Sequence, residues 1–332
     1  MIRRQTLFSV IALGAVVAWP RAGAQRSNRL RRIGVLNARS APNELDAAFR
    51  DGMRARGYIE GRDLAIETRW GGTSIERAQE LAAELVARDV EVIVTATTAA
   101  VRGAMRATRS VPIVMAASAD PVGSGLVASL ARPGGNVTGL TLNSTDTAAK
   151  RLQLLRELIP SATRAAVLLE GATVPGAGEQ VNLLLIDQLQ AAARQIGLSL
   201  TVKGIGTAGE IESALQVMQR ERAQVLLVQA SRLMIDNRSS IVELVAQHRL
   251  PAMYEVKGFV EAGGLLSYGP SLEDMYRRAA GYVDKILKGA KPADLPIEQP
   301  IKFELFINMR AAKALDITIP PSILLRAERV IE

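Results

Sequence analysis

The sequence predicts an α/β protein with two lobes, each built on an open, mainly parallel sheet. From Ile33 onward, short apolar segments alternate with amphipathic stretches, which is typical of βαβ units with right-handed crossovers. The apolar segments are runs of Val, Ile and Leu, as expected for strands buried on both faces. This pattern restarts after Asn143 without a low-complexity linker. We therefore expect two similar lobes joined by short hinge crossings.

The elements of the first lobe follow from hydrophobic periodicity. Strands are expected at 33–37, 64–70, 90–95, 112–115 and 137–141, and helices at 43–56, at 74–88 and from 97 onward. Ser74 is a typical N-cap, and Gly57 typically ends a helix. A further short helix is expected after Asp120 and Pro121, ahead of a glycine turn at 132–136.

The elements of the rest of the chain follow in the same way. Strands are expected at 165–169, 198–202, 225–228, 251–254 and 265–268, with an edge-type strand at 303–307. Helices are expected at 145–158, up to 196, at 209–222, 235–248, 275–288 and 309–315, and as a C-terminal turn. The glycine-rich stretch 171–178 is interpreted as a rim loop, because it has no lysine to hold a phosphate. Lobe 1 is assigned 33–142 plus about 269–300, and lobe 2 is assigned 143–268 plus about 301–332.

The N-terminal residues have a different composition. Two arginines precede an apolar run from Leu7 to Trp19, and small residues at 22–24 match a cleavage site. This pattern predicts a signal peptide at 1–24, followed by a basic arm at 25–32. The net charge of +8 is concentrated there, which argues against a basic face that binds nucleic acid. With no cysteine, the chain has neither a lipid-anchor cysteine nor disulfides, so we expect a soluble, exported protein.

Residues capable of catalysis are scarce. The single histidine, His248, is expected on the polar surface of a helix, and there is no cysteine. Metal sites built on His or Cys, a Ser-His-Asp triad and the usual phosphate-binding glycine motifs are therefore not predicted. We expect no catalytic residue, no metal and no cofactor. One alternative stays open, an exported α/β enzyme that uses Asp120 and Glu170 as a carboxylate pair.

Polar residues at the predicted carboxyl ends of strands form the candidate ligand site, because open α/β sheets bind ligands there. The candidates are Asn37, Thr97, Thr98, Ser118, Asp120, Glu170, Gln229, Ser231, Tyr254 and Tyr268. The two threonines begin a helix whose free N–H groups favour a carboxylate, and Asp120 or Glu170 can pair with an ammonium. The tyrosines can cover an apolar side chain. Each residue can instead serve a turn, a cap or the core, but together they predict a site for a zwitterion between the lobes.

Several short segments between Ile33 and the C-terminus match those of one known family. They are Gly57–Gly61, Leu81–Val86, Asp120–Val127, Arg132–Gly139, Gly264–Pro270, Tyr282–Gly289 and Ile319–Ser322. On these segments the chain resembles the periplasmic solute-binding proteins of ABC importers, in the branch that includes receptors for tryptophan and other aromatic amino acids.

The resemblance implies a type I clamshell of two Rossmann-like lobes that close on a small-molecule ligand by hinge motion. It implies a monomer in the periplasm that delivers a small polar solute, such as an amino acid or an aromatic acid, to ABC permease membrane subunits. In such proteins the third and fourth strands hold the ligand's carboxylate and amine, which implies roles for Thr97, Thr98, Ser118 and Asp120.

The second lobe departs from the family pattern and leaves the ligand's identity open. Glu170 stands where many relatives have Asn-Pro, and residues 229–231 stand where many have Asp-Pro. A LacI-type regulator core is a third alternative, but the chain lacks a DNA-binding headpiece.

Overall fold

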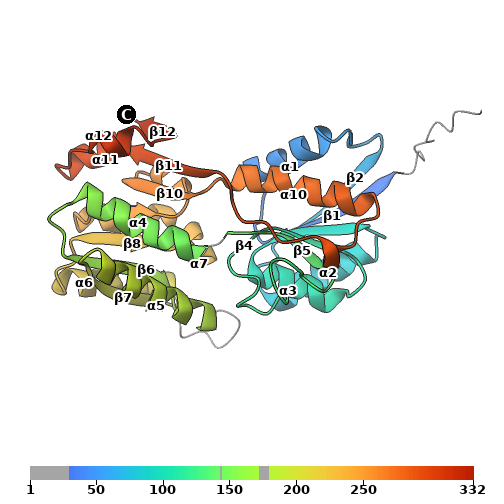
Figure 1. Ribbon diagram of the computed structural model, residues 1–332, viewed down its shortest axis with the longest axis horizontal. Helices are drawn as coiled ribbons and strands as arrows, with labels where there is room; N and C mark the ends of the chain where they lie inside the picture. The colour runs from blue at the N-terminus through green and yellow to red at the C-terminus, as the bar shows by residue number, and fades with distance from the viewer. Residues whose placement is uncertain (1–29, 143, 172–178) are drawn as a thin grey trace, which may run out of the picture.

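Two separate sheets form the centres of two lobes that lie side by side (Figure 1). The computed structural model describes residues 30–142, 144–171 and 179–332. The strands of lobe 1 are β1 (Arg31–Asn37), β2 (Leu64–Trp70), β3 (Val92–Ala96), β4 (Ile113–Ser118) and β5 (Val137–Thr141). Its helices are α1 (Glu44–Arg54), α2 (Ile75–Val86), α3 (Thr98–Ala107), α10 (Leu272–Leu287) and the 3-10 turn η2 (Pro292–Asp294).

Lobe 2 contains the remaining elements. Its strands are β6 (Arg164–Glu170), β7 (Ser199–Ile205), β8 (Val225–Val228), β9 (Ala252–Tyr254), β10 (Leu266–Pro270), β11 (Phe303–Asn308) and β12 (Arg329–Ile331). Its helices are α4 (Ser144–Leu158), α5 (Glu179–Gln195), η1 (Ala208–Glu210), α6 (Ile211–Arg220), α7 (Arg232–Asp236), α8 (Arg238–Gln247), α9 (Gly258–Glu261), α11 (Met309–Ala314) and α12 (Pro321–Leu324).

The sheet of lobe 1 is fully parallel, with strand order β2-β1-β3-β4-β5. Helix α10 returns from the C-terminal part of the chain and packs beside α1 (Figure 1). Gly52 permits this approach, because a Cβ there would lie 2.6 Å from the Arg277 carbonyl oxygen. On the other side, α2 and α3 meet at Gly103, where a Cβ would lie 2.5 Å from that of Ala78. The sheet is thus buried on both faces, as its apolar strands predict.

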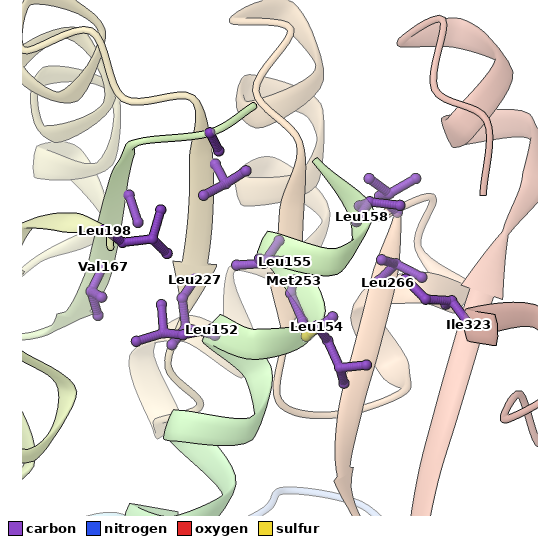
Figure 2. Close-up of a cluster of buried hydrophobic side chains, with 14 of the residues drawn as sticks. Leu152, Leu154, Leu155, Leu158, Val167, Leu198, Leu227, Met253, Leu266 and Ile323 are labelled. Carbon is purple, nitrogen blue, oxygen red and sulfur yellow. The ribbon is translucent and has the colours of Figure 1, made fainter. Parts of the chain in front are cut away.

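The sheet of lobe 2 has the order β12-β11-β10-β9-β8-β6-β7 and is parallel except that β11 runs antiparallel to β10. Helix α4 covers one face with a row of leucines that point toward the strands (Figure 2). Leu152, Leu155 and Leu158 lie on this row, at helical spacing, and are buried against the cluster that includes Val167 and Met253. The two open, parallel-dominated lobes confirm the predicted fold class.

The chain crosses from lobe 1 to lobe 2 between β5 and α4, and returns between β10 and α10. It crosses again ahead of β11, after Glu298 has paired with β5 through its N–H to the Gly139 carbonyl at 3.0 Å. Strand β10 continues to Pro270, which pairs with Phe303 of β11.

Several local predictions were wrong. The expected helix after Asp120 is a series of turns, because the aspartate binds the backbone of Gly123 and Gly125 adopts a positive φ of 68°. The segment 303–307 is not an edge strand, because β12 pairs with its outer side. The helix expected at 235–248 is divided at Asn237 into α7 and α8, and α9 was not predicted.

The proposed signal peptide and nearly all of the glycine-rich loop 171–178 lie outside the described residues. Within the described ranges, no helix is long and apolar enough to cross a membrane.

Candidate functional site

The carboxyl ends of the two sheets face each other where the lobes meet. Arg232, shortly after β8, donates a hydrogen bond from Nη1 to the carbonyl of Ala38, directly after β1, at 2.6 Å. Lys257, which follows β9, forms an ion pair with Glu273 at the start of α10, with Nζ and Oε1 2.5 Å apart. These contacts define what we call the lobe junction, the region where strand-end residues of both lobes come together.

Thr97 stands out at the lobe 1 side of the junction. It is the N-cap of α3, with its hydroxyl accepting the N–H of Ala100 at 3.3 Å and its own N–H bound to the Ala117 carbonyl at 3.0 Å. Its φ is +72°, a conformation that costs a β-branched residue about 1–3 kcal/mol. Such strain is concentrated at functional sites. The exposed Thr97 and half-buried Thr98 thus present a helix N-terminus at the junction.

Ser118, the last residue of β4, lies next to this helix start. Its side chain is fully buried, and its Oγ has no hydrogen-bond partner among the described residues. Its carbonyl is occupied by the N–H of Leu142 at 2.7 Å and the hydroxyl of Thr141 at 3.1 Å. A buried hydroxyl without a partner is unfavourable by about 1–3 kcal/mol. The unpaired hydroxyl makes Ser118 a candidate for bonding a ligand or a water molecule.

Asp120 forms a turn, the structural alternative recognised from the sequence. Its Oδ1 accepts the N–H of Gly123 at 2.9 Å, and its carbonyl accepts the N–H of Ser124 at 3.0 Å. Glu170 ends β6 in the other lobe, so the two carboxylates of the enzyme alternative belong to different lobes. The single histidine caps α8 and bonds to Gln219 and Glu212 of α6. Nothing in these arrangements supports the enzyme alternative.

Asn37 is committed to a polar network within lobe 1. Its Nδ2 donates to Asp46 Oδ1 at 3.1 Å, and its Oδ1 accepts from Arg39 at 3.2 Å. Arg39 also pairs with Asp46 at 3.0 Å and lies over the Trp70 ring, 5.7 Å from its centroid. The amide of Asn37 therefore positions Arg39 beside the indole, a pair that sequence reasoning did not identify.

In lobe 2 the structure brings Gln229 and Ser231 to the end of β8. Gln229 is buried, and its Oε1 has no partner among the residues the structure describes. Ser231 caps α7 by accepting the N–H of Met234 at 3.2 Å. Tyr268, on β10, is half-buried and stacks on Phe303 with ring centroids 5.9 Å apart. The unpaired oxygen makes Gln229 the clearest ligand-binding candidate in this lobe.

Tyr254 departs from the expected role. Its side chain is 1% exposed and stacks on Phe259 within the core, with ring centroids 4.7 Å apart. Burial raises the pKa of its phenol well above the usual value of 10.0. Because side chains alternate across a strand, the last residue of β9 faces the helices of the lobe and not the junction.

A buried ion pair beneath the strand ends of lobe 2 was missed. Arg151 of α4 is fully buried, with Nη2 lying 2.9 Å from Glu255 Oε1 and Nε donating to the Tyr268 carbonyl at 2.6 Å. Glu255 Oε2 accepts the N–H of Ala230 at 2.9 Å. The pair thereby ties together the ends of β8, β9 and β10. Its sequence signal is an arginine on the apolar stripe of α4, four and seven residues before Leu155 and Leu158.

Among the described residues, no group of three or more His, Cys, Asp and Glu side chains is arranged to hold a metal ion. The junction therefore offers helix N–H groups, a hydroxyl and an amide oxygen, which suit a small polar ligand.

The chain is similar to known proteins along most of its length. The profile of the family described as ABC transporter substrate binding protein matches residues 35–331. A tyrosine-binding protein of Clostridioides difficile is 27% identical over 294 residues, covering 87% of this chain and 82% of its own.

Two solved structures are also similar. One is an ABC domain in complex with L-Trp from Streptococcus pneumonia, with a TM-score of 0.79, 27% identity, and coverage of 91% of this chain and 99% of that one. The other is a conserved domain protein from Vibrio cholerae, with a TM-score of 0.80, 27% identity, and coverage of 91% and 100%.

Proposed function

The chain belongs to the ABC transporter substrate-binding protein family, and on that premise we propose that it is an exported receptor for an amino acid. The observation that carries the proposal is the pairing of a strained helix N-terminus at Thr97 with the buried, unpaired hydroxyl of Ser118. The helix N-terminus and the hydroxyl both provide hydrogen-bond donors, and the α-carboxylate of an amino acid accepts such hydrogen bonds.

The ligand is proposed to lie at the lobe junction with its carboxylate on lobe 1. The free N–H groups at the start of α3 and the Ser118 hydroxyl would hold the carboxylate. The unpaired Oε1 of Gln229, an acceptor on lobe 2, would receive the ammonium group. A zwitterion would thus bridge the two lobes, and its binding would favour the state in which Arg232 contacts Ala38.

An aromatic side chain is the favoured ligand class. The similar proteins include one named for tyrosine and one with L-Trp bound. In this chain the half-buried rings of Tyr268, on β10, and of Trp70, at the end of β2, offer aromatic surfaces for such a group.

The remaining parts of the proposal concern location and partners. The basic start, apolar run and small residues of segment 1–24 support export to the periplasm. Family membership supports delivery of the ligand to ABC permease membrane subunits. We further propose that the receptor acts as a monomer and binds no nucleic acid, because the charge excess is confined to the N-terminal segment.

Isothermal titration of the purified protein with each of the twenty L-amino acids tests the proposal. At least one amino acid should bind, and we expect an aromatic amino acid to bind most tightly. Ser118→Ala should weaken that binding about tenfold to a hundredfold, as for loss of a hydrogen bond to a charged group. The same change should leave the unfolding temperature equal or higher, because it removes an unpaired buried hydroxyl.

Ser213→Ala, an exposed serine of α6, is the matched control and should change neither quantity. The proposal is wrong if no amino acid binds, or if the protein instead binds a ligand that has no ammonium and carboxylate groups.

A further inference from the structure

An open groove of about 560 Å³ lies in lobe 1 between α2, the C-terminal half of α3 and the turns at 121–127. Leu126, which is buried, and the half-buried Met105 form its apolar floor. Arg102, Arg106 and Arg109 project from α3 and the bend that follows it. The proposed amino-acid site does not use any of these residues, so the groove needs its own explanation.

The positive charge of the groove is mostly uncompensated. Arg106 pairs with the exposed Glu76 at 3.3 Å. Arg109 makes no ion pair or side-chain hydrogen bond with any residue the structure describes. Arg102 donates from Nη2 to the carbonyl of Ser124, which is neutral, and its Nε is buried without a partner. Three guanidinium groups therefore face one carboxylate.

Helix electrostatics accounts for only one of these arginines. Arg106 lies in the last turn of α3, where a cation complements the helix dipole. Arg102 lies a full turn earlier, and its side chain is held in place by Ser124. A buried donor on a fixed guanidinium, beside two further arginines, is suited to binding an anion.

The number of arginines indicates the charge of that anion. Arg102 and Arg106 are one helical turn apart on α3, and Arg109 follows two residues after the helix end. A single carboxylate or phosphate leaves part of this positive charge uncompensated, whereas an anion with two or more acidic groups can pair with several of the guanidinium groups at once. The anion that fits best carries two or more acidic groups.

We propose that this groove is a binding site for a small polyvalent anion bearing two or more carboxylate or phosphate groups. The site is separate from the lobe junction, and the inference does not depend on the proposed amino-acid function. Citrate and pyrophosphate are the probes for the two chemistries, with acetate and inorganic phosphate as single-group comparisons.

Calorimetric titration of the full protein at low ionic strength tests the site, because salt screens exposed charges. Citrate or pyrophosphate should bind at one site per chain, and more tightly than acetate or inorganic phosphate. Arg109→Gln, which breaks no ion pair or side-chain hydrogen bond among the described residues, should weaken binding about threefold to tenfold. The double change of Arg106 and Arg109 to Gln should weaken it further still.

Arg310→Gln is the matched control, since Arg310 is exposed on α11 of lobe 2. It should leave anion binding unchanged, and Arg109→Gln should leave amino-acid binding unchanged. The proposal is overturned if neither polyvalent anion binds, or if Arg310→Gln weakens binding as much as Arg109→Gln.

Discussion

Replacing Arg151 by methionine should destabilise lobe 2 strongly. The arginine is fully buried, and its guanidinium faces Glu255, whose carboxylate is itself 6% exposed. Methionine fills much of the same volume but leaves the carboxylate buried without its counter-charge. Breaking a buried pair on one side typically costs about 3–5 kcal/mol. For a lobe of this size we expect the unfolding temperature to fall by roughly 6–20 °C.

A double-mutant cycle separates the ion pair from simple loss of packing. Glu255→Gln removes the charge but keeps an amide oxygen for the N–H of Ala230. Combining it with Arg151→Met should recover most of the lost stability, because no unpaired charge remains. Thermal unfolding of the wild type, both single variants and the double variant measures the coupling. A double variant as unstable as the sum of the two single changes would refute the reasoning.

Three further perturbations have expected outcomes. Gly139→Ala should destabilise lobe 1 by about 3 kcal/mol or more, because φ at this position is +130° and a Cβ would lie 2.2 Å from the Met115 carbonyl oxygen. Urea unfolding measures this loss, and an unchanged unfolding midpoint would contradict the prediction. Glu157 receives hydrogen bonds from Ser322 and Arg326, which hold its carboxyl pKa below the ordinary 4.5. Its contribution to stability should be present above about pH 4.5 and lost as the pH falls through the lowered pKa. Wild type and Glu157→Gln should therefore differ in unfolding temperature at pH 7, and the difference should disappear once the pH falls below that lowered pKa. Arg232→Ala removes the hydrogen bond to the Ala38 carbonyl between the lobes, and calorimetry should show ligand binding weakened about threefold to tenfold. The control variant Arg238→Ala should bind the ligand like the wild type, because the hydrogen bond of Arg238 lies within lobe 2. Equal affinities for the two variants would argue against a role for Arg232 in closing the lobes.

Most of the fold could be predicted because its signals are local. The strand 64–70 and the strand 225–228 have the expected bounds, since hydrophobic runs and flanking turns determine them. The turns after Asp120 could not be distinguished from a helix, because a side-chain bond to Gly123 competes with helical bonding. The short β12 has little apolar signal and forms by pairing with β11, a long-range contact.

The candidate site was predictable only in part. Ser118 and Gln229 lie at the carboxyl ends of their strands, as the sequence predicts. The sequence could not show which of their polar atoms lack hydrogen-bond partners. Tyr254 ends a strand like the others, yet its ring points into the core. The Arg151–Glu255 pair joins residues more than a hundred positions apart, so the sequence could indicate a buried arginine on α4 but not its partner.

The most direct test of the central claim is a crystal structure of the protein with the amino acid that binds most tightly. The account predicts the ligand at the lobe junction, with its carboxylate at the start of α3 and on Ser118 Oγ, and its ammonium near Gln229. A ligand bound within one lobe only, or one that leaves the Ser118 hydroxyl unpaired, would contradict it.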